Sequence, residues 1–118
     1  MRFEKTEDGI IDTQTGLIWK SEDEPGMYTF DEALAHTKNV TDWRLPTVEE
    51  LSSILDRTVL SPACNPIFNM KPSVYWSSSP YANFSDAAWF VNFYNGNVGN
   101  SYRSNDWWVR LVRTIGGK

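Results

Sequence analysis

The sequence predicts an α+β fold in which two short helices pack on an antiparallel sheet. Short strand-like runs open the chain, two helix-capping sequences follow, and alternating aromatic runs separated by turns fill the last third. Because the helix signals stand apart from most of the strand signals, this order is typical of α+β rather than of alternating units. A length of 118 residues favours one domain over residues 1–118.

The first strands are expected over residues 9–20. Ile10-Ile11 and Leu17-Ile18-Trp19 flank the turn residues of Asp12–Gly16, which favours two short strands joined by a turn. Ser21–Gly26 follows as an acidic run that ends in Pro-Gly, and it is predicted to be a solvated loop.

Two capping boxes predict the helices. Thr29 and Thr47 each precede a glutamate three residues later, and the two side chains of such a pair accept reciprocal backbone hydrogen bonds at a helix start. Helices are therefore predicted over residues 30–38 and 48–56. Apolar residues recur at helical spacing in the second. Neither helix is long enough to be stable alone, so we expect both to pack on the sheet.

The last third supplies most of the predicted sheet. Ser61–Pro72 contains three prolines and is predicted to be an irregular connection. Asn95-Gly96 is expected to form the type I′ turn of a hairpin. The strands are predicted over residues 75–78, 88–93, 97–102 and 107–114.

Large apolar side chains dominate the expected core. In the run 88–93, Trp89, Val91 and Phe93 share one face. Arg110 and Arg113 lie three apart in a strand and point to opposite faces, so at most one is inside, paired with an acidic residue of a helix. The predicted core residues are Trp19, Trp43, Leu45, Leu51, Leu55, Trp89, Val91 and Leu111.

Charge is distributed unevenly along the chain. Residues 1–56 contain thirteen acidic and five basic side chains, whereas residues 57–118 contain two acidic and six basic ones. With a net charge of −4 and a pI near 4.9, the chain lacks the basic face that general nucleic-acid binding needs. No stretch approaches a membrane span, so neither nucleic acid nor membrane is an expected partner. The N-terminus lacks a signal peptide, which predicts a cytoplasmic protein or an exported fragment of a longer one.

The residue inventory argues against catalysis. Cys64 is the only cysteine, so it cannot form an intramolecular disulfide and is expected to be a packed thiol. His36 is the only histidine and is expected to be structural. Metal binding needs converging ligands, whereas Glu22-Asp23-Glu24 reads as a solvated loop and the Asn-rich segment 95–106 is explained equally by turns. We therefore expect no enzyme activity, no cofactor and no metal.

A recognition surface is the better interpretation of the last third. Residues 75–108 hold eleven aromatic residues, six asparagines and six serines but no lysine or glutamate, which suits adaptable binding better than a core. We expect a polysaccharide ligand, or else a protein, because rings stack on the apolar faces of sugars and amides bind their hydroxyls. Arg103 would select an anionic group through a charge-assisted hydrogen bond. The predicted contact residues are Tyr94, Asn95, Asn97, Asn100, Tyr102, Arg103, Asn105 and Trp107.

Five segments in order resemble a known family. They are DTQTGLIW at residues 12–19, DWRLPT at 42–47 leading to Glu50-Leu51, YWSSS at 75–79, the Ala-Trp to Gly run of 88–96, and VRLVR at 109–113. Their order and spacing resemble the Lcl C-terminal domain family, the terminal domain of bacterial collagen-like adhesins, which is also found as a stand-alone domain. The resemblance covers about residues 8–114.

The resemblance implies a C-type-lectin-like fold related to formylglycine-generating enzymes. It implies binding of sulfated glycosaminoglycans and assembly into trimers, so a homo-oligomer is expected. The enzyme branch implies a cysteine pair or copper-binding cysteines, which Cys64 alone cannot supply. An inactive relative of those enzymes is one alternative. Another is a protein-binding variable protein of a diversity-generating retroelement, because such proteins share the fold and have a similar Asn-, Ser- and Tyr-rich tract.

Overall fold

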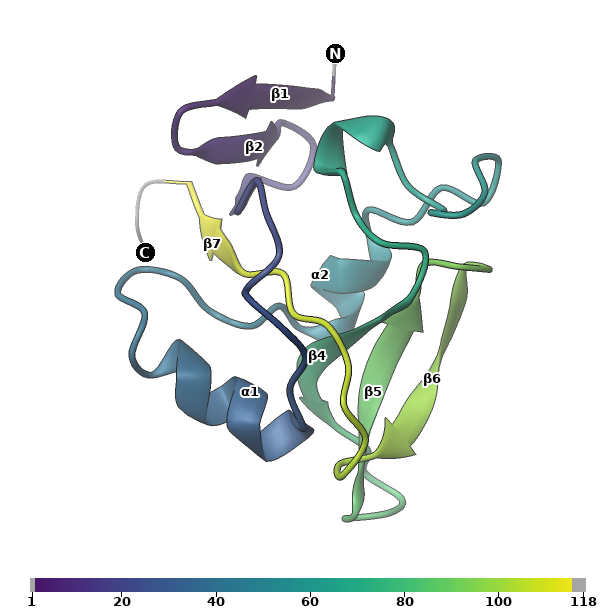
Figure 1. The fold of residues 1–118 in the computed structure, drawn as a ribbon. Helices are drawn as coiled ribbons and strands as arrows, with labels where there is room; N and C mark the ends of the chain where they lie inside the picture. Colours follow the sequence, from purple (N-terminus) through teal and green to yellow (C-terminus); the bar gives the residue numbers. More distant parts are fainter. Residues whose placement is uncertain (1, 116–118) are drawn as a thin grey trace.

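Two antiparallel sheets and two short helices make up the structure, a computed structural model that describes residues 2–115 (Figure 1). One sheet has the order β1-β2-β3-β7, with strands Phe3–Thr6, Gly9–Asp12, Leu17–Trp19 and Val112–Thr114. The other has the order β4-β5-β6, with strands Val74–Pro80, Ala87–Asn92 and Asn97–Tyr102. The helices are α1, Phe30–Thr37, and α2, Val48–Ser52, with a 3-10 turn, η1, at Pro66–Phe68. The predicted α+β class is confirmed.

The N-terminal sheet contains the predicted pair of short strands and one more. β2 and β3 pair antiparallel, and the Gly16 N–H donates to the Asp12 carbonyl (2.9 Å) to close the turn between them. β1 adds to the outer side of β2. It is an exposed edge strand with the sequence FEKT, and so short a charged strand gives no alternating apolar pattern to detect.

The last strand returns to the start of the chain. β7 pairs antiparallel with β3, so that Val112 lies opposite Trp19 and Thr114 opposite Leu17. The predicted strand over residues 107–114 is therefore only partly correct: its end joins the N-terminal sheet, and the strands of the last third do not form one continuous sheet.

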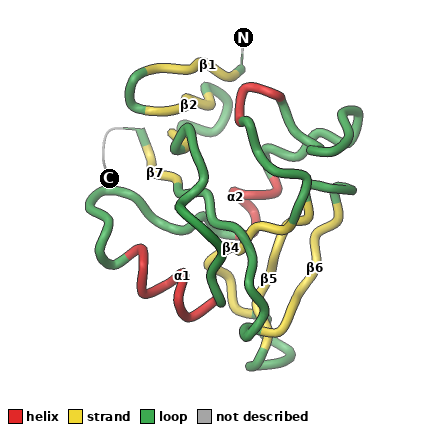
Figure 2. Tube along the Cα trace, viewed as in Figure 1, coloured by secondary structure: helices red, strands yellow, loops and turns green. Residues whose placement is uncertain are grey.

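Residues 107–111 connect the two sheets without forming a regular strand. Figure 2 shows this segment as loop that runs through the middle of the molecule. On one side its carbonyls accept hydrogen bonds from the N–H groups of Lys20, Glu24 and Tyr28 (2.8–2.9 Å). On the other side the Trp108 carbonyl accepts from the Trp76 N–H of β4 (2.9 Å). The backbone of residues 107–111 therefore bonds to two neighbouring segments. One runs antiparallel to it, at Tyr28, and the other runs parallel to it, at Tyr75.

Both capping boxes form as predicted. The Thr29 and Thr47 hydroxyls accept from the Glu32 and Glu50 N–H groups, and the glutamate side chains accept from the threonine N–H groups. No helix within residues 2–115 is long and apolar enough to cross a membrane.

The second helix ends at Ser52, several residues before the predicted end at 56. Leu55 forms a β-bridge with Cys64, and the Asp56 N–H donates to the Ala63 carbonyl (2.8 Å). The Asp56 carboxylate then accepts from the Thr58 N–H (3.0 Å), which turns the chain away. The apolar spacing continued past the helix because the following extended residues also face the core.

The core consists of two clusters on the two faces of β5. One cluster includes Trp19, Leu51 and Val91, and the other is built from residues of α1, β4 and the chain end. Among the predicted core residues, Trp19, Leu45, Leu51, Val91 and Leu111 are buried, whereas Trp43, Leu55 and Trp89 are only partly buried. Trp89 packs against the first cluster but also lines a surface hollow beside α2, so its side chain is only partly buried.

The hairpin between β5 and β6 differs from the predicted type I′ turn. Asn92 pairs with Asn97, which leaves a four-residue loop over 93–96, closed by the Gly96 N–H donating to the Asn92 carbonyl (2.8 Å). A type I′ turn needs positive φ at both central residues, but here Gly96 has φ 80° and Asn95 does not lie in that region. Phe93, buried in the core, anchors the longer loop.

Candidate functional site

The eight predicted contact residues are spread along β6 and the segments that flank it. Tyr94 and Asn95 lie in the hairpin loop, and Asn97 begins the strand. At about 3.3 Å per residue, the far end of β6 lies roughly 16 Å away. The second group is there or in the segment that follows: Asn100, Tyr102, Arg103, Asn105 and Trp107.

Two adjoining hollows flank Tyr102, whose side chain lines both. The larger has a volume of about 590 Å³ and the smaller of about 330 Å³. The lining of the larger is Thr29, Asp31, Asp86, Tyr102, Arg103 and Ser104. The lining of the smaller is Phe84, Ala87, Asn100, Ser101, Tyr102 and Asn105. Hydroxyls, amides and exposed rings therefore converge on this end of the three-stranded sheet.

The polar and aromatic side chains around Tyr102 are held in place by neighbours. Its ring meets that of Phe84 edge to face, with centroids 5.8 Å apart. Asn105 Nδ2 donates to Ser101 Oγ (2.6 Å), and Trp107 Nε1 donates to the same oxygen (3.2 Å). Trp107 itself packs against the core, so it supports the surface from below.

Arg103 is already paired within the larger hollow. It forms an ion pair with Asp31, and its Nη1 donates to the Ser85 carbonyl (3.3 Å). Its guanidinium also lies over the Phe30 ring, 4.9 Å from the centroid. Asp86 lines the same hollow, so the three charged side chains there sum to one negative charge.

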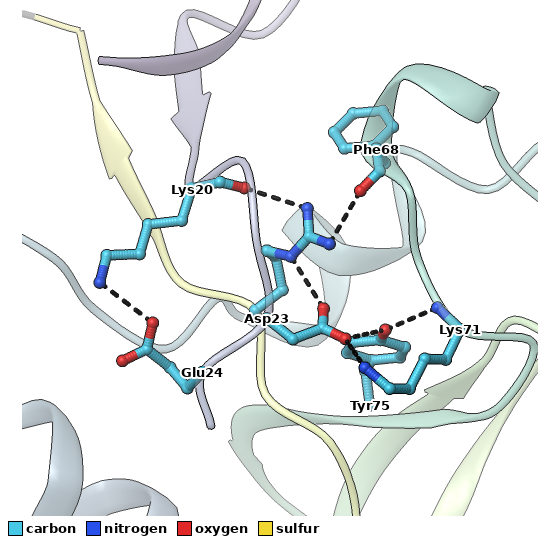
Figure 3. Close-up of polar contacts among 7 residues, drawn as sticks. Lys20, Asp23, Glu24, Phe68, Lys71 and Tyr75 are labelled. Carbon is cyan, nitrogen blue, oxygen red and sulfur yellow. Dashed lines mark hydrogen bonds and ion pairs between the residues drawn. The ribbon is translucent and has the colours of Figure 1, made fainter. Parts of the chain in front are cut away.

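A second polar cluster lies inside the molecule, around the carboxylate of Asp23 (Figure 3). Arg110 Nε donates to Asp23 Oδ1 (2.9 Å). The other two guanidinium nitrogens donate to the carbonyls of Lys20 (3.0 Å) and Phe68 (2.8 Å). Arg110 thus ties together three segments that are distant in sequence.

The other oxygen of Asp23 is bound as well. The Tyr75 hydroxyl and Lys71 Nζ both donate to Oδ2 (2.8 Å each), as Figure 3 shows. Burial raises the pKa of the Tyr75 phenol far above its ordinary value. This phenol therefore stays protonated and serves as a donor to Asp23.

The acidic run Glu22-Asp23-Glu24 was expected to be solvated, and this is wrong for two of its residues. The Asp23 and Glu24 side chains are each only 7% exposed. Glu24 binds Lys20 Nζ (3.0 Å), and its other oxygen lies 2.7 Å from His36 Nε2. The buried arginine also pairs with this loop and not with a helix, because the loop is drawn in against residues 107–111.

Cys64 and His36, the only cysteine and the only histidine of the sequence, are both packed against other residues of the fold. Cys64 is buried, and burial raises the pKa of its thiol to about 11, so the reactive thiolate is scarce at neutral pH. The predicted packed thiol is confirmed. His36 is occupied by Glu24 and packs beside Tyr28, with ring centroids 5.0 Å apart.

The residues that could hold a metal do not converge. Within residues 2–115, no group of three His, Cys, Asp or Glu side chains is placed as metal ligands. In the Asn-rich hairpin, Asn95 Oδ1 accepts from the Asn97 N–H (3.0 Å), a local turn bond. That amide oxygen is used by the backbone of its own loop.

Four residues of the larger hollow are absent from the sequence prediction: Thr29, Asp31, Asp86 and Ser104. Thr29 and Asp31 come from the start of α1, far from β6 in sequence. Their only sequence signal was the capping box, which predicts a helix start and gives no information about its neighbours.

Comparison with known proteins agrees with the segments quoted above. No curated protein matches the chain. The model of one protein family, the Lcl C-terminal domain, matches residues 8–113. This range contains β2, β3 and most of β7 of the N-terminal sheet, all of the three-stranded sheet and both hollows, whereas β1 lies outside it. The chain therefore belongs to the Lcl C-terminal domain family.

Proposed function

We propose that this chain is a non-catalytic binding module for carbohydrate, and that the ligand lies across the two hollows beside Tyr102. The observation that carries the proposal is the position of this tyrosine. Its side chain is exposed, lines both hollows, and is oriented by the ring of Phe84. A rigid exposed ring with polar groups on both sides suits a sugar, which presents an apolar C–H face and a rim of hydroxyls.

The polar lining supports hydroxyl recognition. Thr29 and Ser104 supply hydroxyls on one side of the ring, and Asn100 and Asn105 supply amides on the other. Each of these groups can both donate and accept, as a sugar hydroxyl does. Most of a sugar's hydrogen bonds to water can therefore be replaced when it enters the hollows.

The charges in the larger hollow favour a neutral sugar over a sulfated one. Arg103 is paired with Asp31, and Asp86 adds a further negative charge. An anionic group would have to displace the Asp31 carboxylate before Arg103 could bind it. We therefore propose a neutral polysaccharide as the ligand. Selection of an anionic group by Arg103 is the alternative that the experiment must distinguish from it.

A glycan array that contains neutral and sulfated oligosaccharides tests the proposal. Tyr102→Ala should lower the affinity by about tenfold, equivalent to about 1.4 kcal/mol. Tyr94→Ala is the matched control, because Tyr94 is 59% exposed and Tyr102 is 60% exposed, at opposite ends of the hairpin. The control should bind as wild type does.

The results of the glycan array distinguish the possible ligands and their positions. Absence of glycan binding by the wild type rejects the carbohydrate ligand. An equal loss in both variants places the ligand along the whole hairpin. Preferential binding of sulfated sugars that weakens as salt rises would show that Arg103 exchanges Asp31 for the ligand, since exposed charge contacts are screened.

A further inference from the structure

A third hollow, with a volume of about 560 Å³, lies between α2 and the three-stranded sheet. Its lining residues are Val48, Glu49, Ser52, Ser53, Trp89 and Val98. The first four belong to α2 and its C-cap, whereas Trp89 and Val98 come from β5 and β6. This α2 hollow therefore has apolar walls from both the helix and the sheet, and polar groups from the helix.

The α2 hollow opens on the same face of the sheet as the Tyr102 ring. Side chains alternate along a strand, so Val98, Asn100 and Tyr102 share one face of β6, and all three are exposed. Trp89 pairs directly with Asn100 across the ladder, which puts both side chains on that face with Cβ atoms about 5 Å apart. Trp89 lines the α2 hollow, and Asn100 lines the smaller hollow beside Tyr102. One cross-strand pair thus separates the two hollows.

The Trp89 ring is oriented by a neighbouring ring, as the Tyr102 ring is. Tyr81 meets Trp89 edge to face, with ring centroids 5.1 Å apart, and Phe84 does the same for Tyr102. An indole offers a large, flat apolar surface. Val98 and Tyr102, at the two ends of this face, are roughly 13 Å apart along the strand, which is longer than one sugar ring.

The charge of the α2 hollow disfavours an anionic ligand. Within residues 2–115, Glu49 is the only charged side chain in its lining. A sulfate or carboxylate would be repelled by Glu49, and the apolar walls would not replace its lost hydrogen bonds to water. A neutral sugar can pack its C–H face on Trp89, while Glu49 and Ser52 offer acceptors for its hydroxyls. The α2 hollow and the larger hollow at Arg103 favour a neutral sugar for separate reasons.

We propose that the α2 hollow is a second subsite of the carbohydrate site, in which Trp89 stacks on a further unit of the chain bound at Tyr102. This inference rests on the proposed function, and it specifies the ligand as an internal stretch of a neutral polysaccharide and not a single terminal sugar. The chain crosses the sheet over Asn100, whose amide can donate to one hydroxyl and accept from another. Because the α2 hollow adjoins the polar hollows of Tyr102, one sugar chain can occupy them all.

Calorimetric titration with size-graded neutral oligosaccharides tests the proposal. The probes are oligomers of glucose, mannose, galactose and N-acetylglucosamine, from monosaccharide to hexasaccharide. For the sugar that binds, the affinity of the wild type should increase with chain length until the α2 hollow is filled. Tyr102→Ala should weaken the binding of every length.

Trp89→Leu and Trp89→Phe are a matched pair, because both shorten a partly buried side chain and both keep an apolar contact with the core. Only phenylalanine keeps a flat ring for stacking. Trp89→Leu should lower the affinity for the hexasaccharide by about tenfold and leave the affinity for the monosaccharide unchanged. Trp89→Phe should keep most of the increase with length. Thermal unfolding of both variants shows whether the fold is intact.

Three results would overturn the second subsite and leave the Tyr102 site standing. One is an affinity that does not increase with chain length, and another is an increase that Trp89→Leu retains. The third is an equal loss in Trp89→Leu and Trp89→Phe, which would mean that the tryptophan acts through packing and not through stacking.

Two other results bear on the proposed function. Absence of binding by every neutral oligosaccharide rejects the neutral chain and the second subsite together. Binding that needs Trp89 but is unchanged in Tyr102→Ala would keep the α2 hollow as a sugar site and remove Tyr102 from it.

Discussion

Arg110 and Arg103 each pair with an aspartate, but the two pairs differ in almost every other respect. Arg110 and Asp23 are 1% and 7% exposed, and every nitrogen of the guanidinium donates to a protein oxygen. Arg103 and Asp31 are 35% and 72% exposed, and they border a hollow open to solvent. One pair connects segments inside the fold, whereas the other lies at the surface beside a hollow.

The difference shows why an arginine alone does not identify a binding site. A buried charge must have all its partners supplied by the protein, so the contacts of Arg110 are fixed. An exposed pair contributes little to stability and can rearrange at low cost. The carboxylate of the Arg44–Glu50 pair lies between these extremes at 23% exposed, although Arg44 itself is 42% exposed. The three carboxylates, Asp23, Glu50 and Asp31, form a graded series of exposure.

The largest loss of unfolding free energy is expected for the most buried pair, Arg110–Asp23. Arg110→Met removes the arginine and leaves the Asp23 carboxylate and two carbonyls with fewer partners. Loss of one member of a buried pair costs about 3–5 kcal/mol, and we expect the lower value because Lys71 and Tyr75 still bind Asp23. Urea unfolding measures the loss.

Arg113→Met is the control for this variant. Arg113 is only half-buried and lies over the Trp43 ring, 4.9 Å from its centroid. Its replacement should cost about 1 kcal/mol or less, as for an exposed cation–π contact. Equal losses of unfolding free energy in the two variants would contradict the distinction between the fully buried Arg110 and the half-buried Arg113.

A smaller loss of unfolding free energy, which depends on pH, is expected for Glu50→Gln. Burial alone would raise the pKa of Glu50, but hydrogen bonds from Arg44 and the Thr47 backbone outweigh it and hold the pKa below the ordinary value of 4.5. The ionised form is thus favoured by folding, and its contribution is present above pH 4.5 and lost as pH falls through the folded pKa. Glutamine keeps the capping box but not the ion pair.

At pH 7 this variant should be less stable than wild type by about 1 kcal/mol, the upper value for an ion pair that is partly exposed. The gap in unfolding free energy should narrow below pH 4.5. Other acidic groups such as Asp12 titrate alike in both proteins, so they cancel in the difference. A gap that is the same at pH 3 and pH 7 would show that the ion pair contributes nothing.

The smallest effect on stability is expected at the exposed end. Arg103→Ala should change the free energy of unfolding by no more than about 0.5 kcal/mol. The same variant frees Asp31 and makes the larger hollow more negative, so binding of a sulfated sugar should weaken while the fold remains intact. A loss of stability comparable to that of Arg110→Met would mean that this pair also holds the fold together.

The sequence was informative where local rules determine structure. Thr29 and Thr47 predict their helix starts because a capping box is complete within four residues. The same kind of local pattern failed at Leu55, where apolar spacing continues although the helix has ended. The prediction of a type I′ turn at Asn95-Gly96 was wrong for a similar reason. The buried Phe93 lengthens the loop beyond the two residues that the Asn-Gly dipeptide favours.

Long-range pairing accounts for what the sequence did not reveal. Asp23 looks solvated until residues 107–111 fold over its loop and Arg110 reaches it. The larger hollow likewise needs the start of α1 beside Arg103, two segments far apart in the chain. The predicted list of contact residues followed sequence order, so it ran along β6 from one end to the other, whereas the hollows gather only its last part.

The pairing of β7 with β3 also determines when this protein can become folded during synthesis. Until the ribosome has released residues 112–114, β3 can pair with β2 alone and lacks the strand on its other side. Before residues 57–118 are made, the nascent chain is only its acidic half, in which thirteen acidic side chains oppose five basic ones over residues 1–56. Mutual repulsion of these charges keeps an unfinished chain dissolved and open. The N-terminal sheet is therefore completed only after residues 112–114 have been made.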